Sequence, residues 1–266
     1  NIKKSFFDSL SKSSFAIVNK DDKNGMKMIE STQANKITYS IKSLSDYRCK
    51  ILENQFNGML LSLNKIDLWV KLIGKFNAYN ILSVYAIANQ FFLNHQELLS
   101  ALSMLDVVEG RFQRISANNI TCIVDYAHTD DALKNVLETI NDIKCTTQGL
   151  VTVIGCGGDR DKEKRPRIGS VAFSLSTQVI FTADNPRTED VTMIIDDMLQ
   201  NLSKAQQKEV LIVNNRREAI KIACRLAKKN DIVLVAGKGH EKYQEINGKK
   251  IPFDDLIELK KSLNII

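Results

Sequence analysis

The chain has 266 residues, of which 44% are hydrophobic, so it can bury a substantial core and is long enough for two ordinary domains. No apolar run reaches the roughly 18 residues that a membrane helix needs, which argues against insertion into a membrane. The formal net charge of +6 is too modest to select nucleic acid as a partner and favours anionic ligands only in general.

The amino-terminal sequence, NIKKSFFDSL, has neither an initiator methionine nor a secretory apolar segment, so we expect a truncated or incomplete chain. The five cysteines are odd in number and contain no CxxC pair. Reduced thiols of this kind are typical of the cytoplasm, which is the predicted location.

The first part of the chain is rich in short β-type runs. Strands are predicted at 15–19, 48–54, 58–64 and 67–73, and helices at about 77–93 and 95–105. The pattern changes near residues 106–112, so we divide the chain into domains at 1–108 and 109–266. The pattern of the first domain is typical of the tail of an α/β domain.

The second part alternates apolar strands with amphipathic helices. Strands are predicted at 120–125, 149–155, 178–183, 209–214 and 231–237, and helices at 130–142, 166–176, 190–202 and 216–229. Such alternation predicts an α/β fold made of right-handed βαβ units on a mostly parallel sheet that is covered on both faces.

Charged and small residues follow each predicted strand of the second part. The segments are DYAHTD (125–130), GCGGDRDKEKR (155–165), DNPRTED (184–190), NNRRE (214–218) and GKGHEKYQ (237–244). Ligands bind beyond the carboxyl ends of the strands in such sheets, so these segments predict one shared site.

The segment GCGGDRDKEKRPR (155–167) combines three glycines with Pro166 near a helix start and with five cations. The cations are Arg160, Lys162, Lys164, Arg165 and Arg167. Each opposes the helix dipole by roughly 0.3–1 kcal/mol, so a bound anion would resolve the conflict. A solvated charged turn is the alternative, because the segment lacks the G-x-G-x-x-G spacing.

The segment DYAHTDDALKNVLETI (125–140) places Asp125 and His128 on a short turn, with Thr129 or Asp130 available to cap the next helix. Asp125 is a candidate for binding ribose hydroxyls or lying near a metal, and His128 for contacting phosphate. A structural role is an equal alternative for His128 and the better one for His95, because the histidines lack zinc-ligand spacing.

Two glycine-lysine segments, IGKFN (73–77) and AGKGHEKYQ (236–244), lack the Ser or Thr that a Walker A loop requires after its lysine. No P-loop is therefore predicted in this sequence. Glu241 is suited to a substrate ammonium group, and an exposed glutamate is the alternative.

The segment DNPR (184–187) follows directly after a buried-looking strand. Pro186 fixes its own φ and biases Asn185 towards extended backbone, which helps to aim Arg187 from the strand end. A guanidinium held in this way suits a carboxylate, which it binds with two parallel hydrogen bonds.

Six segments in register along nearly the whole chain resemble the MurE ligases of the Mur ligase family. They are VKLIGKFNAYN, VVEGRFQRI, VDYAHTDDALKNVL, GCGGDRDKEKRP, TADNPRTED and AGKGHEKYQ. The resemblance implies the rear part of a central ATP-binding domain at 1–108, with the P-loop missing, and a Rossmann-like, mostly parallel-sheet, amino-acid-binding domain at 109–266. In the family the Walker-type loop, its acidic metal ligand and the uridine-nucleotide domain lie upstream of the position of Lys3.

The resemblance also implies residue roles. DNPR marks the members that add meso-diaminopimelate, so Arg187 would hold the carboxylate that lysine lacks. The implied diaminopimelate pocket consists of Arg160, Asp184, Asn185, Pro186, Arg187, Gly237 and Glu241. The implied ATP contacts are Asn77, Asn80, Arg111, Asp125 and His128. Lys3 matches a catalytic lysine that becomes carbamylated and helps to place magnesium.

The implied reaction is ATP-dependent amide formation with Mg²⁺ as the metal. The D-glutamate γ-carboxylate of UDP-N-acetylmuramoyl-L-alanyl-D-glutamate attacks ATP and becomes an acyl phosphate, from which the diaminopimelate amine displaces phosphate. We expect a cytoplasmic monomer with no nucleic-acid partner and no membrane insertion.

Two other interpretations stay open. A folylpolyglutamate synthase-like ligase shares the architecture but adds glutamate to a pteridine substrate, and DNPR favours the MurE-like interpretation over it. A non-catalytic module would instead bind nucleotide or nucleic acid through the basic loop at 160–167, although no aromatic residues are interleaved with those cations.

Overall fold

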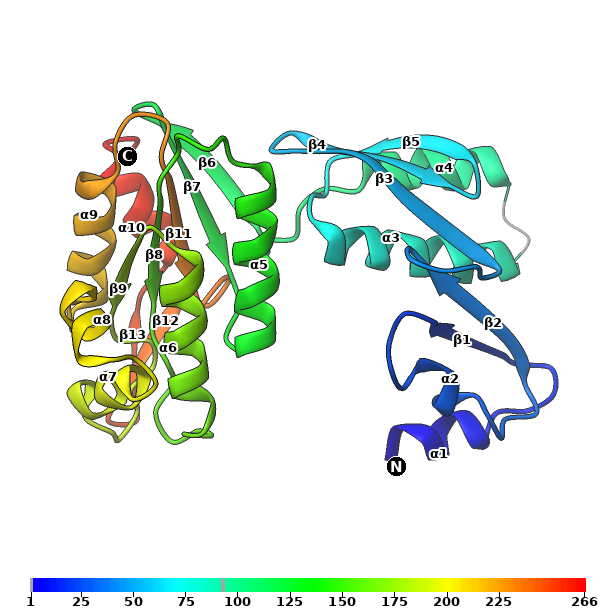
Figure 1. Ribbon diagram of the computed structural model, residues 1–266, viewed down its shortest axis with the longest axis horizontal. Coiled ribbons are helices and arrows are strands. Elements are labelled where there is room, and N and C mark those ends of the chain that lie inside the picture. Colours follow the sequence, from blue (N-terminus) through cyan, green and yellow to red (C-terminus); the bar gives the residue numbers. More distant parts are fainter. Residues whose placement is uncertain (1, 92–93) are drawn as a thin grey trace. The chain divides into compact units, whose positions relative to one another are not determined.

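The computed structural model describes residues 2–91 and 94–266, which fall into two compact units, one up to Asp106 and one from Val107 onwards (Figure 1). Each unit has its own sheet and is described separately. Among the described helices, none has the length and apolarity needed to cross a bilayer. All five cysteines are free thiols.

Unit 1 contains a five-stranded sheet in the order β1-β2-β3-β4-β5. Its strands are β1 (Phe15–Asn19), β2 (Asn35–Ser40), β3 (Tyr47–Gln55), β4 (Gly58–Leu63) and β5 (Ile66–Val70). Its helices are α1 (Ile2–Asp8), α2 (Gly25–Met28), α3 (Lys75–Ala88), the 3₁₀ turn η1 (Asn89–Phe91) and α4 (His95–Met104). The strands β1, β2 and β3 are parallel, whereas β3, β4 and β5 form an antiparallel meander.

The meander has one buried face and one open face because apolar and polar side chains alternate along its strands. Cys49 on β3 and Met59, Leu61 and Leu63 on β4 are buried, while their neighbours Lys50 and Ser62 point the other way. Helix α3 packs against β1, β2 and β3 through its apolar side.

The four strands predicted for unit 1 are present, and β2 was missed. Its sequence NKITYS is mostly polar and only its last residue is fully buried, so it lacks a clear apolar pattern. The helix expected at 77–93 begins earlier, at Lys75, and ends at Ala88 before η1; residues 92–93 lie outside the described part. His95 begins α4 and packs edge-on against Tyr85, with ring centroids 5.7 Å apart.

Unit 2 contains a six-stranded sheet in the order β10-β9-β8-β11-β7-β6, in which only β6 is antiparallel. Its strands are β6 (Gln113–Ala117), β7 (Ile120–Asp125), β8 (Leu150–Ile154), β9 (Gln178–Phe181), β10 (Leu211–Ile212) and β11 (Ile232–Ala236). Its helices are α5 (Asp130–Ile143), α6 (Lys164–Leu175), α7 (Val191–Leu199), α8 (Lys204–Glu209), α9 (Arg216–Leu226) and α10 (Asp255–Ser262). A hairpin, β12 (Tyr243–Ile246) with β13 (Lys249–Pro252), completes the unit.

The helices of unit 2 cover both faces of its sheet, as Figure 1 shows. Helix α6 packs between α5 and α7, whereas α9 packs against α10. Every residue of β8 and β11 is buried, which explains their continuous apolar sequences. The predicted α/β class with a mostly parallel sheet is confirmed.

Several parts of unit 2 differ from the predictions. The strand expected at 209–214 is wrong in extent, because α8 continues to Glu209 and β10 spans only Leu211–Ile212. The antiparallel edge strand β6 and the β12–β13 hairpin were missed, since both are largely polar. Helix α10 was also missed; Asp254 caps it by accepting hydrogen bonds from the Leu256 and Ile257 amides.

Candidate functional site

The carboxyl ends of β7, β8, β9 and β11 open onto one cavity of about 260 Å³ in unit 2. The register pairs Asp125 with Ala236 and Ile154 with Phe181, so the four strands end close together. Seven predicted site residues line the cavity: His128, Arg160, Asp184, Asn185, Arg187, Gly237 and Glu241. Pro186 is buried but does not line it.

Two glycines of the GCGG segment let neighbouring strand ends approach closely. A Cβ at Gly155 would lie 2.3 Å from the Thr182 carbonyl oxygen, and one at Gly158 would lie 1.9 Å from the Pro186 carbonyl oxygen. Any larger side chain would push these segments apart. The glycines therefore serve the packing of the loop at 155–160 against DNPR.

Most of the cations around the start of α6 pair with carboxylates of the protein itself. Arg165 is fully buried and binds Glu189 and Asp197 at 2.8 and 2.9 Å. Lys162 pairs with Glu189 at 3.1 Å, and Arg167 with Asp130 at 3.3 Å. These carboxylates provide the counter-charge for which the sequence had suggested a bound anion.

Arg160 differs from these neighbours. It is exposed, lines the cavity and forms no ion pair within residues 2–91 and 94–266. Lys164, which also lines the cavity, donates a hydrogen bond to the His128 carbonyl oxygen at 3.1 Å. Arg160 is thus the cation of this loop that remains available to an anionic ligand group.

The Arg187 guanidinium is held at the rim of the cavity and is mostly buried, with 19% of the side chain exposed. Its Nη1 donates to the Gly158 carbonyl oxygen at 2.7 Å, and its Nε lies 3.2 Å from a Glu245 carboxylate oxygen. Its backbone is left-handed, with φ at +52°, and its amide donates to the Glu245 carbonyl oxygen. The β12 strand, which the sequence did not reveal, therefore helps Pro186 to orient this residue.

A hydrogen-bonded network joins the DNPR segment to the loop after β11. The fully buried Lys238 donates to the Asn185 side-chain oxygen at 2.8 Å and to Glu241 Oε2 at 2.9 Å. The Asn185 amide nitrogen also donates to Glu241 Oε2, at 2.8 Å. Burial raises the pKa of Glu241, but the bonds from Lys238 and Asn185 outweigh it and hold that pKa below its usual value.

The sequence did not predict Lys238 as a site residue, because a lysine between two glycines first suggests a phosphate loop. A lysine between two glycines after a fully buried strand was the available signal. Its ammonium group fixes the amide orientation of Asn185 and keeps Glu241 ionised. The cavity thus presents a carboxylate from Glu241 and guanidinium groups from Arg160 and Arg187.

A second buried cation, Arg216, ties the strand ends together from behind. It binds both carboxylate oxygens of Asp255, at 2.8 and 2.7 Å. It also donates to the carbonyl oxygens of Ala183 and Ala236, at 3.3 and 2.9 Å.

Burial raises the pKa of the nearby Asp184, although the positive charges of Lys238 and Arg216 act to lower it. The sequence placed Arg216 in the strand-exit segment NNRRE but predicted no individual role for it, because the strand before it was poorly predicted.

Asp125, Arg111 and His128, the predicted nucleotide contacts of unit 2, surround Tyr126. Asp125 is buried and accepts hydrogen bonds from the amides of Phe112 and Ala127, at 2.7 and 2.8 Å. Burial raises its pKa against these bonds. The Arg111 guanidinium lies 4.6 Å from the Tyr126 ring centre, and the exposed His128 ring lies 4.6 Å from it on an edge contact.

The remaining predicted residues belong to unit 1. Asn77 and Asn80 lie in the first turns of α3, where the Asn80 amide donates to the Asn77 side-chain oxygen at 3.2 Å. Lys3 lies exposed in α1. The described residues contain no group of three or more His, Cys, Asp or Glu side chains that could by themselves hold a metal.

Solved structures of ligases share this fold. A structure of UDP-N-acetylmuramoyl-L-alanyl-D-glutamate--2,6-diaminopimelate ligase matches 95% of the chain with a TM-score of 0.64 and 36% identity, over 53% of its own length. A MurF ligase from Thermotoga maritima in complex with ADP matches 97% of the chain with a TM-score of 0.70, over 56% of its length; at 14% identity it supports the fold alone.

Family models identify both units. The Mur ligase middle domain matches residues 1–88, and the Mur ligase glutamate ligase domain matches residues 110–239. The chain belongs to the Mur ligase family.

The chain is also similar to curated UDP-N-acetylmuramoyl-L-alanyl-D-glutamate--2,6-diaminopimelate ligases. It is 48% identical to that of Cytophaga hutchinsonii over 99% of the chain and 54% of the relative. It is 50% identical to that of Phocaeicola vulgatus over 95% of the chain and 52% of the relative. The chain spans about half the length of these relatives.

Proposed function

We propose that this chain provides the amino-acid-adding part of an ATP-dependent ligase that joins meso-diaminopimelate to UDP-N-acetylmuramoyl-L-alanyl-D-glutamate. The named relatives act on these substrates, and the chain retains about half identity to them. The observation that carries the proposal is the mostly buried Arg187 guanidinium at the rim of the unit 2 cavity.

The cavity suits a diamino diacid better than lysine. Arg187 and Arg160 would each take a carboxylate, and Glu241 would take an ammonium group next to the Gly237 backbone. Lysine has one carboxylate fewer, so it would leave one of these guanidinium groups without its partner. Lys238 and Asn185 keep Glu241 in place and charged for this role.

The nucleotide would be bound by Asn77, Asn80, Arg111, Asp125 and His128. The free lone pairs of the Asp125 carboxylate suit ribose hydroxyls, and the cation Arg111 suits a phosphate. Lys3 would act as a carbamate that helps to place magnesium, which would offset phosphate charge during transfer.

We further propose a monomer that works in the cytoplasm, where ATP and the nucleotide-linked substrate are available.

In the reaction, this chain would bind the diamino acid so that one amine faces the activated γ-carboxyl group of D-glutamate. That amine attacks the acyl phosphate, and phosphate leaves as the amide forms. The domain boundary proposed near residue 108 would allow closure to bring the two substrates together.

Binding of the amino acid tests the proposal. Titration calorimetry of the chain with meso-diaminopimelate, L-lysine and L-glutamate should show a preference for diaminopimelate. Arg187→Ala should weaken diaminopimelate binding about tenfold to a hundredfold, as expected for loss of a charged hydrogen bond, and should leave lysine binding nearly unchanged. Arg217→Ala, at a 57% exposed position of α9, serves as the control. Equal affinities for lysine and diaminopimelate would contradict the assigned role of Arg187, and a preference for glutamate would favour the folylpolyglutamate synthase-like alternative.

Activity needs a separate test. The chain can be fused to the remaining amino-terminal half of the Phocaeicola vulgatus relative, and phosphate release can be measured with the dipeptide nucleotide and each amino acid. Release that depends on diaminopimelate supports the ligase proposal. Release without any dependence on the amino acid would contradict it.

A further inference from the structure

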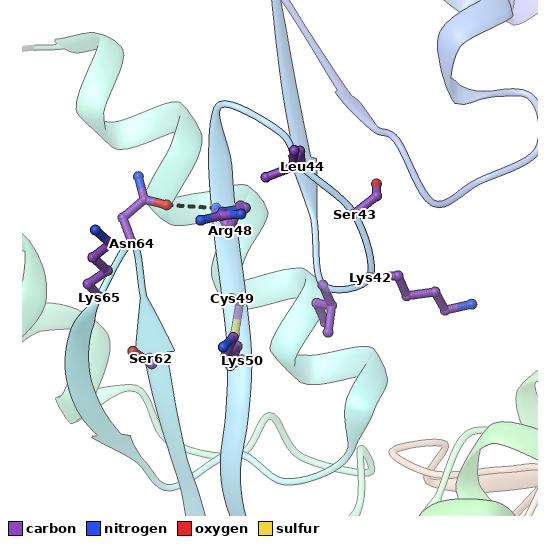
Figure 2. A pocket seen from close by; sticks show the side chains of 10 residues that line it. Lys42, Ser43, Leu44, Arg48, Cys49, Lys50, Ser62, Asn64 and Lys65 are labelled. Carbon is purple, nitrogen blue, oxygen red and sulfur yellow. Dashed lines mark hydrogen bonds between the residues drawn. The ribbon is translucent and has the colours of Figure 1, made fainter.

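Unit 1 has a cavity of its own, of about 430 Å³, which no predicted ligase residue lines. It lies where the loop after β2 meets the start of β3 and the turn between β4 and β5 (Figure 2). Its volume falls within the range of roughly 300–1,000 Å³ that is usual for small-molecule sites.

The cavity is lined by four cations and by no acidic residue. The cations are Lys42, Arg48, Lys50 and Lys65. Within residues 2–91 and 94–266, none of their side chains forms an ion pair or a hydrogen bond with another residue. Four like charges around one hollow repel one another, and an anion placed among them would relieve that repulsion.

The backbone holds these cations in a defined arrangement. Arg48 and Lys50 are two residues apart on β3, so they point to the same face of the sheet. The Arg48 amide donates to the Asn64 side-chain oxygen at 2.7 Å, drawn as a dashed line in Figure 2, and the Asn64 amide donates back to the Arg48 carbonyl oxygen. The neighbouring Lys65 lies in a tight turn, with φ at +74°.

The fourth cation, Lys42, stands at the rim on the loop after β2. This loop is not loose, because the Asp21 carboxylate accepts hydrogen bonds from the amides of Ile41 and Lys42, at 2.8 and 3.2 Å. Lys20 also donates to the Leu44 carbonyl oxygen at 2.7 Å. The rim is therefore built by the fold even though the lysine side chain itself extends towards solvent.

The rest of the lining is both apolar and polar. Leu44 is 73% exposed and offers an apolar surface beside the cations, while Ser43 and Ser62 offer hydroxyl groups. No aromatic side chain is among the lining residues that the structure describes, so bases of a nucleic acid have no stacking partner there. The hollow shape and the lone arginine fork suit a compact anion better than an extended polymer.

We propose that this cavity is a second anion site, which binds the diphosphate group of a small-molecule ligand. A diphosphate carries enough charge to engage several of the cations, and the Arg48 guanidinium can bind phosphate oxygens in pairs. Lys50 and Lys65 add point charges on either side. The diphosphate comes either from free inorganic pyrophosphate or from a nucleoside diphosphate whose organic part packs on Leu44.

Titration calorimetry tests the site with inorganic pyrophosphate, cytidine diphosphate and citrate. The chain should bind pyrophosphate, and the Arg48→Ala/Lys50→Ala variant should bind it at least about tenfold more weakly. The matched control, Arg225→Ala/Lys12→Ala, removes one arginine and one lysine from exposed positions that form no ion pair in the described part of the chain, and it should keep the original affinity. Arg48→Lys keeps the charge but loses the fork, so it should give an intermediate affinity.

The measured affinities distinguish the two sources of the diphosphate, and they also identify the results that would overturn the proposal. Tighter binding of cytidine diphosphate than of pyrophosphate, lost in Arg48→Ala/Lys50→Ala, assigns the site to a nucleotide, and equal affinities assign it to the free anion. Citrate binding as tight as that of pyrophosphate overturns the preference for phosphate. Absence of pyrophosphate binding at millimolar concentration, or equal weakening in the control variant, overturns the site.

Discussion

The two cavities differ in whether their cations are paired with carboxylates of the protein. Around the unit 2 cavity, Arg165, Arg216 and Lys238 are fully buried, and each is bound to carboxylates of the protein. Around the unit 1 cavity, Arg48 and Lys50 are exposed and lack protein partners among the described residues. Buried pairs hold loops in a fixed arrangement, whereas unpaired cations keep their charge for a ligand.

This difference distinguishes cations that position other groups of the protein from cations that are available to bind an anionic ligand. In unit 2 the fully buried paired cations place the backbone and the carboxylate of Glu241. Arg160 and the partly exposed Arg187, which also contacts Glu245, line the cavity. A buried charge is costly to leave alone, so each paired cation should matter for stability or for alignment. An exposed unpaired cation should matter for affinity and hardly at all for folding.

The largest effect is expected at Arg216. Arg216→Met leaves the fully buried Asp255 without its partner, so unit 2 should lose about 3–5 kcal/mol of stability. Urea unfolding followed by hydrogen exchange in β9 and β11 measures this loss. Arg217→Met is the control. Arg217 is 57% exposed, and its partner Glu258 keeps a second cation, Lys261, at 3.2 Å, so this change should cost at most about 1 kcal/mol. The double variant Arg216→Met/Asp255→Leu should recover most of the loss; equal losses for Arg216→Met and Arg217→Met would contradict the comparison.

Lys238 should affect ligand binding more than any other paired cation. Lys238→Met removes the donor that aligns Asn185 and Glu241, so diaminopimelate affinity should fall about tenfold to a hundredfold. Calorimetry on protein that circular dichroism shows to be folded measures the change. Lys221→Met, on the partly exposed side of α9, should leave the affinity unchanged. Unchanged affinity in the folded Lys238→Met variant would exclude its positioning role.

A pH effect should follow from Glu189. The Arg165 guanidinium lowers the pKa of Glu189 from its ordinary value of 4.5 to about 2. Because the folded-state pKa lies below the unfolded one, the pair stabilises the protein above pH 4.5 and this contribution is lost as the pH falls towards 2. Glu189→Gln should therefore flatten the decrease of unit 2 stability between these pH values. An unaltered slope in hydrogen exchange would show that the pair does not contribute.

The smallest effect is expected for the unpaired cations. Arg48→Ala/Lys50→Ala removes no ion pair, so the stability of unit 1 should change by less than about 1 kcal/mol. The single tryptophan, Trp69, lies in β5 of this unit, and its fluorescence during urea unfolding reports the change. A loss as large as that of Arg216→Met would mean that these cations are structural.

Local sequence determined much of this protein. The apolar strands and the alternation in the second part predicted the parallel sheet, because strands buried on both faces must be continuously apolar. The charged and glycine-rich segments after those strands contain all twelve residues that line the unit 2 cavity, and the family resemblance named seven of them. Strand ends are predictable in this way because parallel strands open onto one edge.

Only the tertiary structure decided which cations are paired within the protein and which face a cavity. Arg165 and Arg160 lie five residues apart in one basic segment, yet Arg165 is buried against Glu189 and Asp197 while Arg160 faces the cavity. The partners of Lys238, Arg187 and Arg216 likewise come from distant segments, including the missed hairpin and α10. Pairing depends on distances in space between residues far apart in the chain, and a single sequence does not contain those distances.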